Sequence, residues 1–107
     1  MITQPNRVNA LEILDNIEEI DPYVKFSYDF RNNTYCVHSR VEIGGDGILR
    51  SVSGRALTPE DAIFDLWYQL TNIESDQYVV IDASGENRAA YKWNGKRWVI
   101  KHEKQVK

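Results

Sequence analysis

Apolar residues recur along this chain with two different periods, and the change from one period to the other predicts its secondary structure. Between residues 10 and 20 they recur at intervals of three and four, which predicts a helix with one apolar stripe. We expect Asn9 to cap this helix, with Glu12 three residues later completing a capping box. Asp21 and Pro22 are expected to end it, because a residue that precedes proline avoids helical backbone angles.

Three stretches after this helix alternate between apolar and polar residues, as the strands of a half-buried sheet do. They cover residues 23–30, 34–43 and 48–56. In the first stretch the apolar positions are 24, 26, 28 and 30, and we expect all four side chains to share one face. The glycine-rich segment 44–47 predicts a tight turn between the second and third strands.

A second helix is predicted from Pro59 to about Asn72, with Thr58 as its N-cap. Proline is well tolerated at the first helical position, and the acidic residues that follow it favour the positive end of the helix dipole. The residues expected to face the core recur at helical spacing and are Ala62, Ile63, Leu66, Trp67 and Leu70.

Short strands are predicted at residues 78–82, 89–93 and 96–102. The pair Asn94-Gly95 is typical of a two-residue hairpin turn, which would place Trp93 opposite Lys96 and Tyr91 opposite Trp98. The chain is therefore expected to form one α+β domain over residues 1–107, with residues 1–8 and 103–107 frayed. Its predicted order is α-β-β-β-α-β-β-β, a two-layer sandwich with two helices on one face of an antiparallel sheet.

Composition limits the class of protein. Apolar residues make up 42% of the chain, which is enough for a core, and no apolar run reaches the length of a membrane span. The single cysteine, Cys36, cannot form an internal disulfide. Together with the polar N-terminus, these features predict a soluble cytoplasmic protein that does not bind membranes.

Charge is distributed unevenly along the chain. Residues 1–87 hold 6 Lys/Arg and 15 Asp/Glu, whereas residues 88–107 hold 7 and 1, and the formal net charge is −3. An acidic body with a basic C-terminal end is typical of a chain that contacts nucleic acid or an acidic partner. It is equally typical of a solvated surface kept soluble by lysines.

Two surfaces are candidates for partner binding. The C-terminal hairpin interleaves basic and aromatic side chains, a pattern that suits either single-stranded nucleic acid or a protein interface. The first helix carries an acidic stripe that suits a basic partner, although an ordinary solvated helix face has the same pattern. The residues concerned are Lys92, Trp93, Lys96, Arg97, Trp98 and Lys101 in the hairpin, and Glu12, Asp15 and Glu19 in the helix.

No pattern predicts a catalytic, metal or cofactor site. Cys36 and His38 would lie on the same side of one strand, but a nucleophile and its base also need a third, orienting group. Zinc would require two further ligands beside them. We therefore expect a non-enzymatic protein without a cofactor.

The first seventy residues resemble the double-stranded RNA-binding domain in element order, in the glycine turn at 44–47 and at Ala62. Where that family has RNA-binding lysines, this chain has Pro59, Glu60 and Ile63, so the resemblance implies the topology without the binding site. The small acidic chain also looks like a phage accessory protein. We expect a protein-binding or inhibitory accessory module, monomeric or homodimeric, and the alternative is a nucleic-acid-binding domain that uses the basic hairpin.

Overall fold

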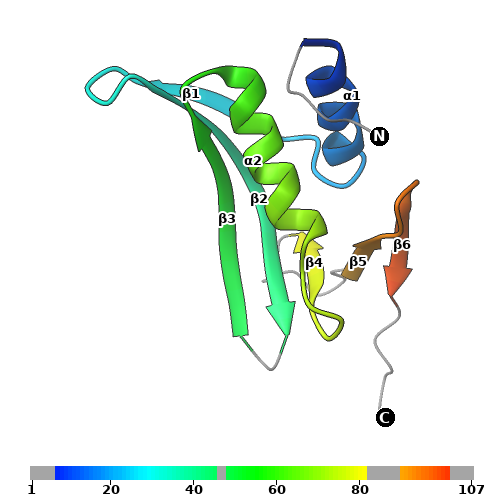
Figure 1. Ribbon diagram of the computed structural model, residues 1–107. Coiled ribbons are helices and arrows are strands. Elements are labelled where there is room, and N and C mark those ends of the chain that lie inside the picture. Colours follow the sequence, from blue (N-terminus) through cyan, green and yellow to red (C-terminus); the bar gives the residue numbers. More distant parts are fainter. Residues whose placement is uncertain (1–6, 46–47, 82–89, 102–107) are drawn as a thin grey trace.

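The predicted order of elements is the one observed (Figure 1). The computed structural model describes residues 7–45, 48–81 and 90–101. The elements are α1 (Arg7–Glu18), β1 (Lys25–Asp29), β2 (Thr34–Gly45), β3 (Ile48–Ala56), α2 (Pro59–Thr71), β4 (Tyr78–Ile81), β5 (Ala90–Trp93) and β6 (Trp98–Lys101). They form an α+β two-layer sandwich in which both helices cover one face of an antiparallel sheet, as the sequence predicts.

Strand β2 organises the sheet. Its first half pairs with β1 and its second half with β4, while β3 pairs with both halves. Because β3 occupies one edge of β2 throughout, β1 and β4 must share the other edge, one after the other. Between them, the register with β3 shifts between His38 and Glu42, where β2 bulges. Strands β5 and β6 extend the sheet beyond β4.

Helix α2 lies directly on the sheet because Gly54 on β3 allows a close approach. A Cβ atom added at Gly54 would lie 2.0 Å from the carbonyl oxygen of Ala62. Thr58 caps the helix through its hydroxyl, which accepts a hydrogen bond from the backbone N–H of Asp61, as the sequence predicts. The buried face of α2 packs on apolar residues of α1 and the sheet, among them Ile13, Ile17, Val37, Val41, Ile43 and Val79.

The start of α1 differs from the prediction. The helix begins at Arg7, so Asn9 lies inside its first turn and is not the N-cap. Arg7 and Val8 are helical rather than frayed, whereas residues 1–6 and 102–107 lie outside the described part of the chain. The guanidinium of Arg7 lies 2.6 Å from the carboxylate of Glu60, an ion pair that joins the first turns of the two helices.

The C-terminal hairpin has a longer loop than predicted. Trp93 pairs with Trp98 and Tyr91 with Ile100, so the strands are joined by four residues instead of two. Asn94 explains the difference, because its side-chain oxygen accepts hydrogen bonds from the backbone N–H groups of Lys96 and Arg97. Such local bonds stabilise a wider loop than the two-residue turn. The shift is two positions, which leaves the same side chains on the same face.

Candidate functional site

The β5–β6 hairpin encloses a cleft of about 550 Å³ against the two helices. Residues from three separate parts of the chain line it: Glu12, Ile13, Asn16, Trp67, Trp93, Gly95 and Lys96. Glu12 was predicted as part of an acidic helix surface, and Trp93 and Lys96 as part of a basic hairpin surface. The structure therefore brings members of the two predicted surfaces together in one cleft of mixed charge.

The hairpin tryptophans contribute to the interior of the domain. The Trp67 ring on α2 lies edge-to-face with Trp93 at 4.8 Å and with Trp98 at 5.8 Å between ring centroids. The indole N–H of Trp98 donates a 2.7 Å hydrogen bond to the backbone carbonyl of Asn16 on α1. Since these rings are half-buried and hold the hairpin to both helices, much of their surface is already in contact with the protein.

The basic side chains of the hairpin have different surroundings. The Lys92 ammonium donates to the backbone carbonyls of Glu74 and Ser75, at 3.2 and 2.7 Å, and so ties β5 to the segment between α2 and β4. Lys96 and Arg97 are exposed in the loop. The side chain of Lys101 lies outside the described residues. The predicted acidic residues Glu12 and Asp15 on α1, and Glu19 directly after it, are all exposed.

A second surface, which the sequence analysis did not identify, is the apolar end. We define it by six exposed large apolar side chains in the first half of α1, on β1 and the turn after it, and just after β3: Val8, Leu11, Phe26, Tyr28, Phe30 and Leu57. Phe30 is 86% exposed and Leu57 is 68% exposed. Figure 1 shows that α2 begins beside β1 and β2 near the turn that joins them, and that α1 lies on the other side of α2 from that turn.

Contacts link four of the six side chains in two pairs. Leu11 and Phe26 line one groove of about 200 Å³, together with Pro59 and Ile63. The Phe30 and Tyr28 rings lie edge-to-face with centroids 6.3 Å apart, and Tyr28 also contacts Tyr35. Leu57 follows Ala56, the residue that pairs with Tyr35 across β2 and β3.

Phe30 was expected to be the last residue of the first strand and to share a face with Val24, Phe26 and Tyr28, but the strand ends before it. Strand β1 ends at Asp29, whose side-chain oxygen accepts hydrogen bonds from the backbone N–H groups of Arg31 and Asn32. The turn therefore begins one residue earlier, and Phe30 lies within it. The hydrogen bonds from Asn32, its side-chain amide first, also lower the pKa of Asp29 from its ordinary value of 3.8.

Asp21 is a buried aspartate with a structural role that the sequence analysis did not predict. Its carboxylate accepts hydrogen bonds from the backbone N–H groups of Arg40, at 2.8 Å, and Tyr23, at 3.0 Å. Arg40 lies on β2 in the interval between the β1 and β4 pairings. Asp21 thus supplies the hydrogen-bond acceptor that a neighbouring strand would otherwise provide, and it allows β2 to change partners.

The pair Cys36 and His38 is not arranged as a nucleophile and base. The Cys36 side chain is buried, while the exposed His38 ring exchanges a 2.7 Å hydrogen bond with the hydroxyl of Ser27. Within the described ranges, no group of three His, Cys, Asp or Glu side chains is placed to hold a metal ion.

Comparisons with known proteins give no relative to this chain. No family model matches it, and neither a curated protein nor a solved structure does so. Within the part of the chain that the structure describes, no helix is both long and apolar enough to cross a membrane.

Proposed function

We propose that this domain is a non-enzymatic protein-binding module that docks its partner on the apolar end. The observation that carries the proposal is the set of six exposed large apolar side chains there, with Leu11 and Phe26 lining one groove and Tyr28 and Phe30 in ring contact. Single exposed apolar residues are common, whereas neighbouring exposed apolar side chains are typical of protein–protein interfaces.

The apolar end is separate from the domain's own core. Buried residues of both helices and the sheet form one cluster beneath it, and Phe30 and Leu57 contribute nothing to that cluster. Their exposure costs solubility without a compensating gain in fold stability, so a partner surface is the simplest physical reason for them. Three of the six side chains are aromatic, the type enriched among the residues that dominate binding energy.

The rim of the apolar end is polar, as interface rims usually are. Arg7 and Glu60 form their ion pair beside the Leu11–Phe26 groove, and hydrogen bonding from Arg7 lowers the pKa of Glu60 below 4.5. The position of Glu60 matches a lysine in the double-stranded RNA-binding family. An acidic side chain there, already paired within the protein, favours a protein partner at this end over an RNA phosphate.

Site-specific photo-crosslinking tests the proposal. The photoreactive amino acid p-benzoylphenylalanine replaces Phe30 in one variant and Leu57 in another, and the proteins are irradiated in the cells that make them. Tyr68 is the matched control, because it is an aromatic residue on α2 that is 65% exposed and lies outside the apolar end. We expect both test positions to give the same crosslinked protein and the control to give none.

The absence of an adduct at both positions would refute the proposal, as would equal labelling from Tyr68. An adduct of the chain with itself would identify the apolar end as a dimer interface instead. The double variant Phe30→Ser, Leu57→Ser should retain the thermal stability of the wild type, because neither side chain is buried. It should lose the partner.

Nucleic-acid binding by the hairpin is the second candidate, favoured by the exposed Lys96 and Arg97. Two observations weigh against it. The Trp93 and Trp98 rings are packed on Trp67 and offer little free surface for bases. The Glu12 carboxylate shares the cleft with Lys96 and would repel a phosphate there.

A fluorescence titration with labelled single- and double-stranded DNA and RNA distinguishes the two candidates. Nucleic-acid binding requires an affinity that falls with rising salt and falls further in the Lys96→Glu, Arg97→Glu variant. No binding at low salt would eliminate this candidate and leave the protein-binding proposal as it stands.

A further inference from the structure

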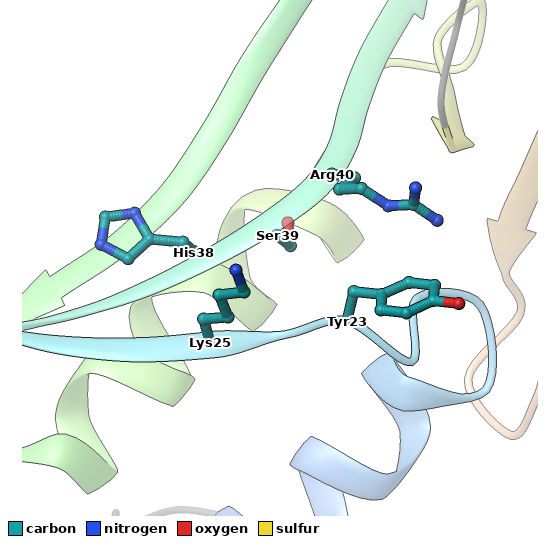
Figure 2. Close-up of a pocket in the computed structure, with 5 residues that line it drawn as sticks. All are labelled: Tyr23, Lys25, His38, Ser39 and Arg40. Carbon is teal, nitrogen blue, oxygen red and sulfur yellow. The ribbon is translucent and has the colours of Figure 1, made fainter. Parts of the chain in front are cut away.

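A pocket of about 320 Å³ lies where β1 leaves β2, and basic side chains dominate it. Its lining residues are Tyr23, Lys25, His38, Ser39 and Arg40 (Figure 2). Lys25 pairs with His38 across β1 and β2, so the two side chains share a face of the sheet. Figure 2 shows Lys25 between His38 and Arg40, which come from the neighbouring strand.

The charge of this pocket is opposite to that of the chain. The formal net charge is −3, yet the described lining residues include three basic side chains and no carboxylate. Asp21 is buried behind Arg40, with its Oδ1 atom 3.8 Å from the guanidinium Nε. A local group of positive charges in a concave surface raises the local concentration of small anions.

Arg40 is held in position before any ligand arrives. Its guanidinium carbon lies 4.5 Å from the centroid of the Tyr23 ring, a cation–π contact, and its backbone N–H is bonded to Asp21. The contact with Asp21 involves Nε, and the two terminal nitrogens carry the other four N–H donors of a guanidinium. A preorganised arginine loses less conformational entropy when it binds a phosphate in bidentate fashion.

We propose that this pocket binds a phosphate monoester group. Lys25 and Arg40 each carry a permanent positive charge toward the charge of about −1.5 to −2 that such a group carries at neutral pH, and the Asp21 carboxylate offsets part of the charge of Arg40. The His38 ring points away from Arg40, and a 2.7 Å hydrogen bond between its Nε2 atom and the hydroxyl of Ser27 holds it in place. The volume lies at the small end of the range for ligand sites, which fits one phosphate with a small organic part against Tyr23.

The carboxylates on the same face are already engaged elsewhere. Asp29 lies farther along β1 and holds the β1–β2 turn through Asn32. Glu42 lies farther along β2, where its carboxylate accepts from the hydroxyl of Ser51 at 3.5 Å. Neither residue lines the pocket, so neither directly opposes an anion beside Lys25 and Arg40. This site is independent of the apolar end, and the two proposals can fail separately.

Titration by nuclear magnetic resonance at low ionic strength tests the proposal. Phenyl phosphate and inorganic phosphate are the probes, and phenol is the uncharged control. We expect both phosphates to shift the signals of Tyr23, Lys25, His38 and Arg40 in a saturable manner, and phenol to shift none of them. Tighter binding of phenyl phosphate would identify an organic phosphate as the ligand, and equal binding would identify free phosphate; either result supports a phosphate site.

Substitutions distinguish a defined site from general attraction to positive charge. Lys25→Gln and Arg40→Gln should each weaken phenyl phosphate binding by about five-fold or more, because each removes a charge-assisted hydrogen bond. Arg55→Gln is the matched control, since Arg55 is exposed on the neighbouring strand β3 and does not line the pocket. Lys25 contributes no buried contact, so its variant remains informative if Arg40→Gln fails to fold.

Two results would overturn the proposal. One is the absence of saturable shifts with both phosphates in the wild-type protein. The other is a loss of affinity in Arg55→Gln equal to that in Lys25→Gln, which would show that binding depends only on the overall charge of the sheet face.

Discussion

Replacement of Gly54 by alanine is the most direct test of how α2 packs on the sheet. The added Cβ atom would lie 2.0 Å from the carbonyl oxygen of Ala62, 2.8 Å from the backbone nitrogen of Leu66 and 3.0 Å from its Cβ atom. The two closest contacts are with backbone, which cannot rotate away as the end of a flexible side chain can. Ordinary van der Waals contact begins at 3.4 Å, so α2 would have to withdraw by about 1.4 Å.

That movement would loosen a large part of the core. Helix α2 buries Ala62, Ile63, Leu66 and Leu70, and three of these are large apolar side chains. Overpacking in a core costs about 1–3 kcal/mol. A clash with rigid backbone belongs at the upper end, so we expect the free energy of unfolding to fall by about 3 kcal/mol. For a domain of this size the melting temperature should fall by about 12–24 °C.

Urea and thermal unfolding followed by circular dichroism measure this change. Ser53→Ala is the control, because Ser53 is the exposed neighbour of Gly54 on β3 and its hydroxyl makes no described contact with the core. We expect the control to lie within about 0.5 kcal/mol of the wild type. A loss in Gly54→Ala of less than about 1 kcal/mol, with unchanged amide signals along α2, would refute the close approach of helix and strand.

Three further predictions follow from individual contacts. Asp21→Ala leaves the backbone N–H groups of Arg40 and Tyr23 without their acceptor, and chemical denaturation should show a loss of about 2–4 kcal/mol, against little change for the exposed Asp15→Ala. Trp98→Phe removes the hydrogen bond to Asn16 and should cost about 1–3 kcal/mol, measured by thermal unfolding; a stability equal to that of the wild type would contradict the packing of the hairpin on α1. Arg7 holds the pKa of Glu60 below 4.5 in the folded protein, so Glu60 binds protons more readily in the unfolded chain. The contribution of the Arg7–Glu60 pair to stability is therefore present above pH 4.5. It is lost as the pH falls through the pKa that Glu60 has in the folded protein. The Glu60→Gln variant should therefore lose less stability on acidification than the wild type does. An equal loss of stability in the two proteins as the pH falls would disprove this link between the pKa of Glu60 and stability.

Local signals in the sequence were sufficient for most of the fold. The Thr58-Pro59 start of α2, its buried stripe and the alternation in β2 and β3 all depend on neighbours a few residues away, and each is observed. Tyr91, Trp93, Trp98 and Ile100 share one face as predicted, because a register shift of two positions preserves the side of the sheet. The predicted length of the hairpin loop was wrong because the Asn94 side chain stabilises a four-residue loop in place of the two-residue turn. The pattern of residue types does not show which of the two loops is more stable.

The candidate sites are formed by residues that lie far apart in the sequence, so local patterns do not predict their contacts. Alternation places Phe26 and Tyr28 on the helix side of the sheet, but only the position of the helices leaves them exposed at the apolar end. Likewise Asp21 ends a helix in the sequence, and only the change of strand partner along β2 makes it the acceptor for Arg40. The same contact places the Arg40 side chain beside Tyr23 and Lys25.

The sequence by itself thus determined the elements, their order and the faces they bury, since periodicity and capping are local properties of the chain. The tertiary structure alone decided which side chains the two helices leave uncovered, and which residues distant in sequence meet in the cleft and in the basic pocket. These outcomes depend on how closely α2 approaches Gly54 and on where β2 changes its partner from β1 to β4. Both are set by packing between segments that are far apart in the sequence, which local patterns do not describe.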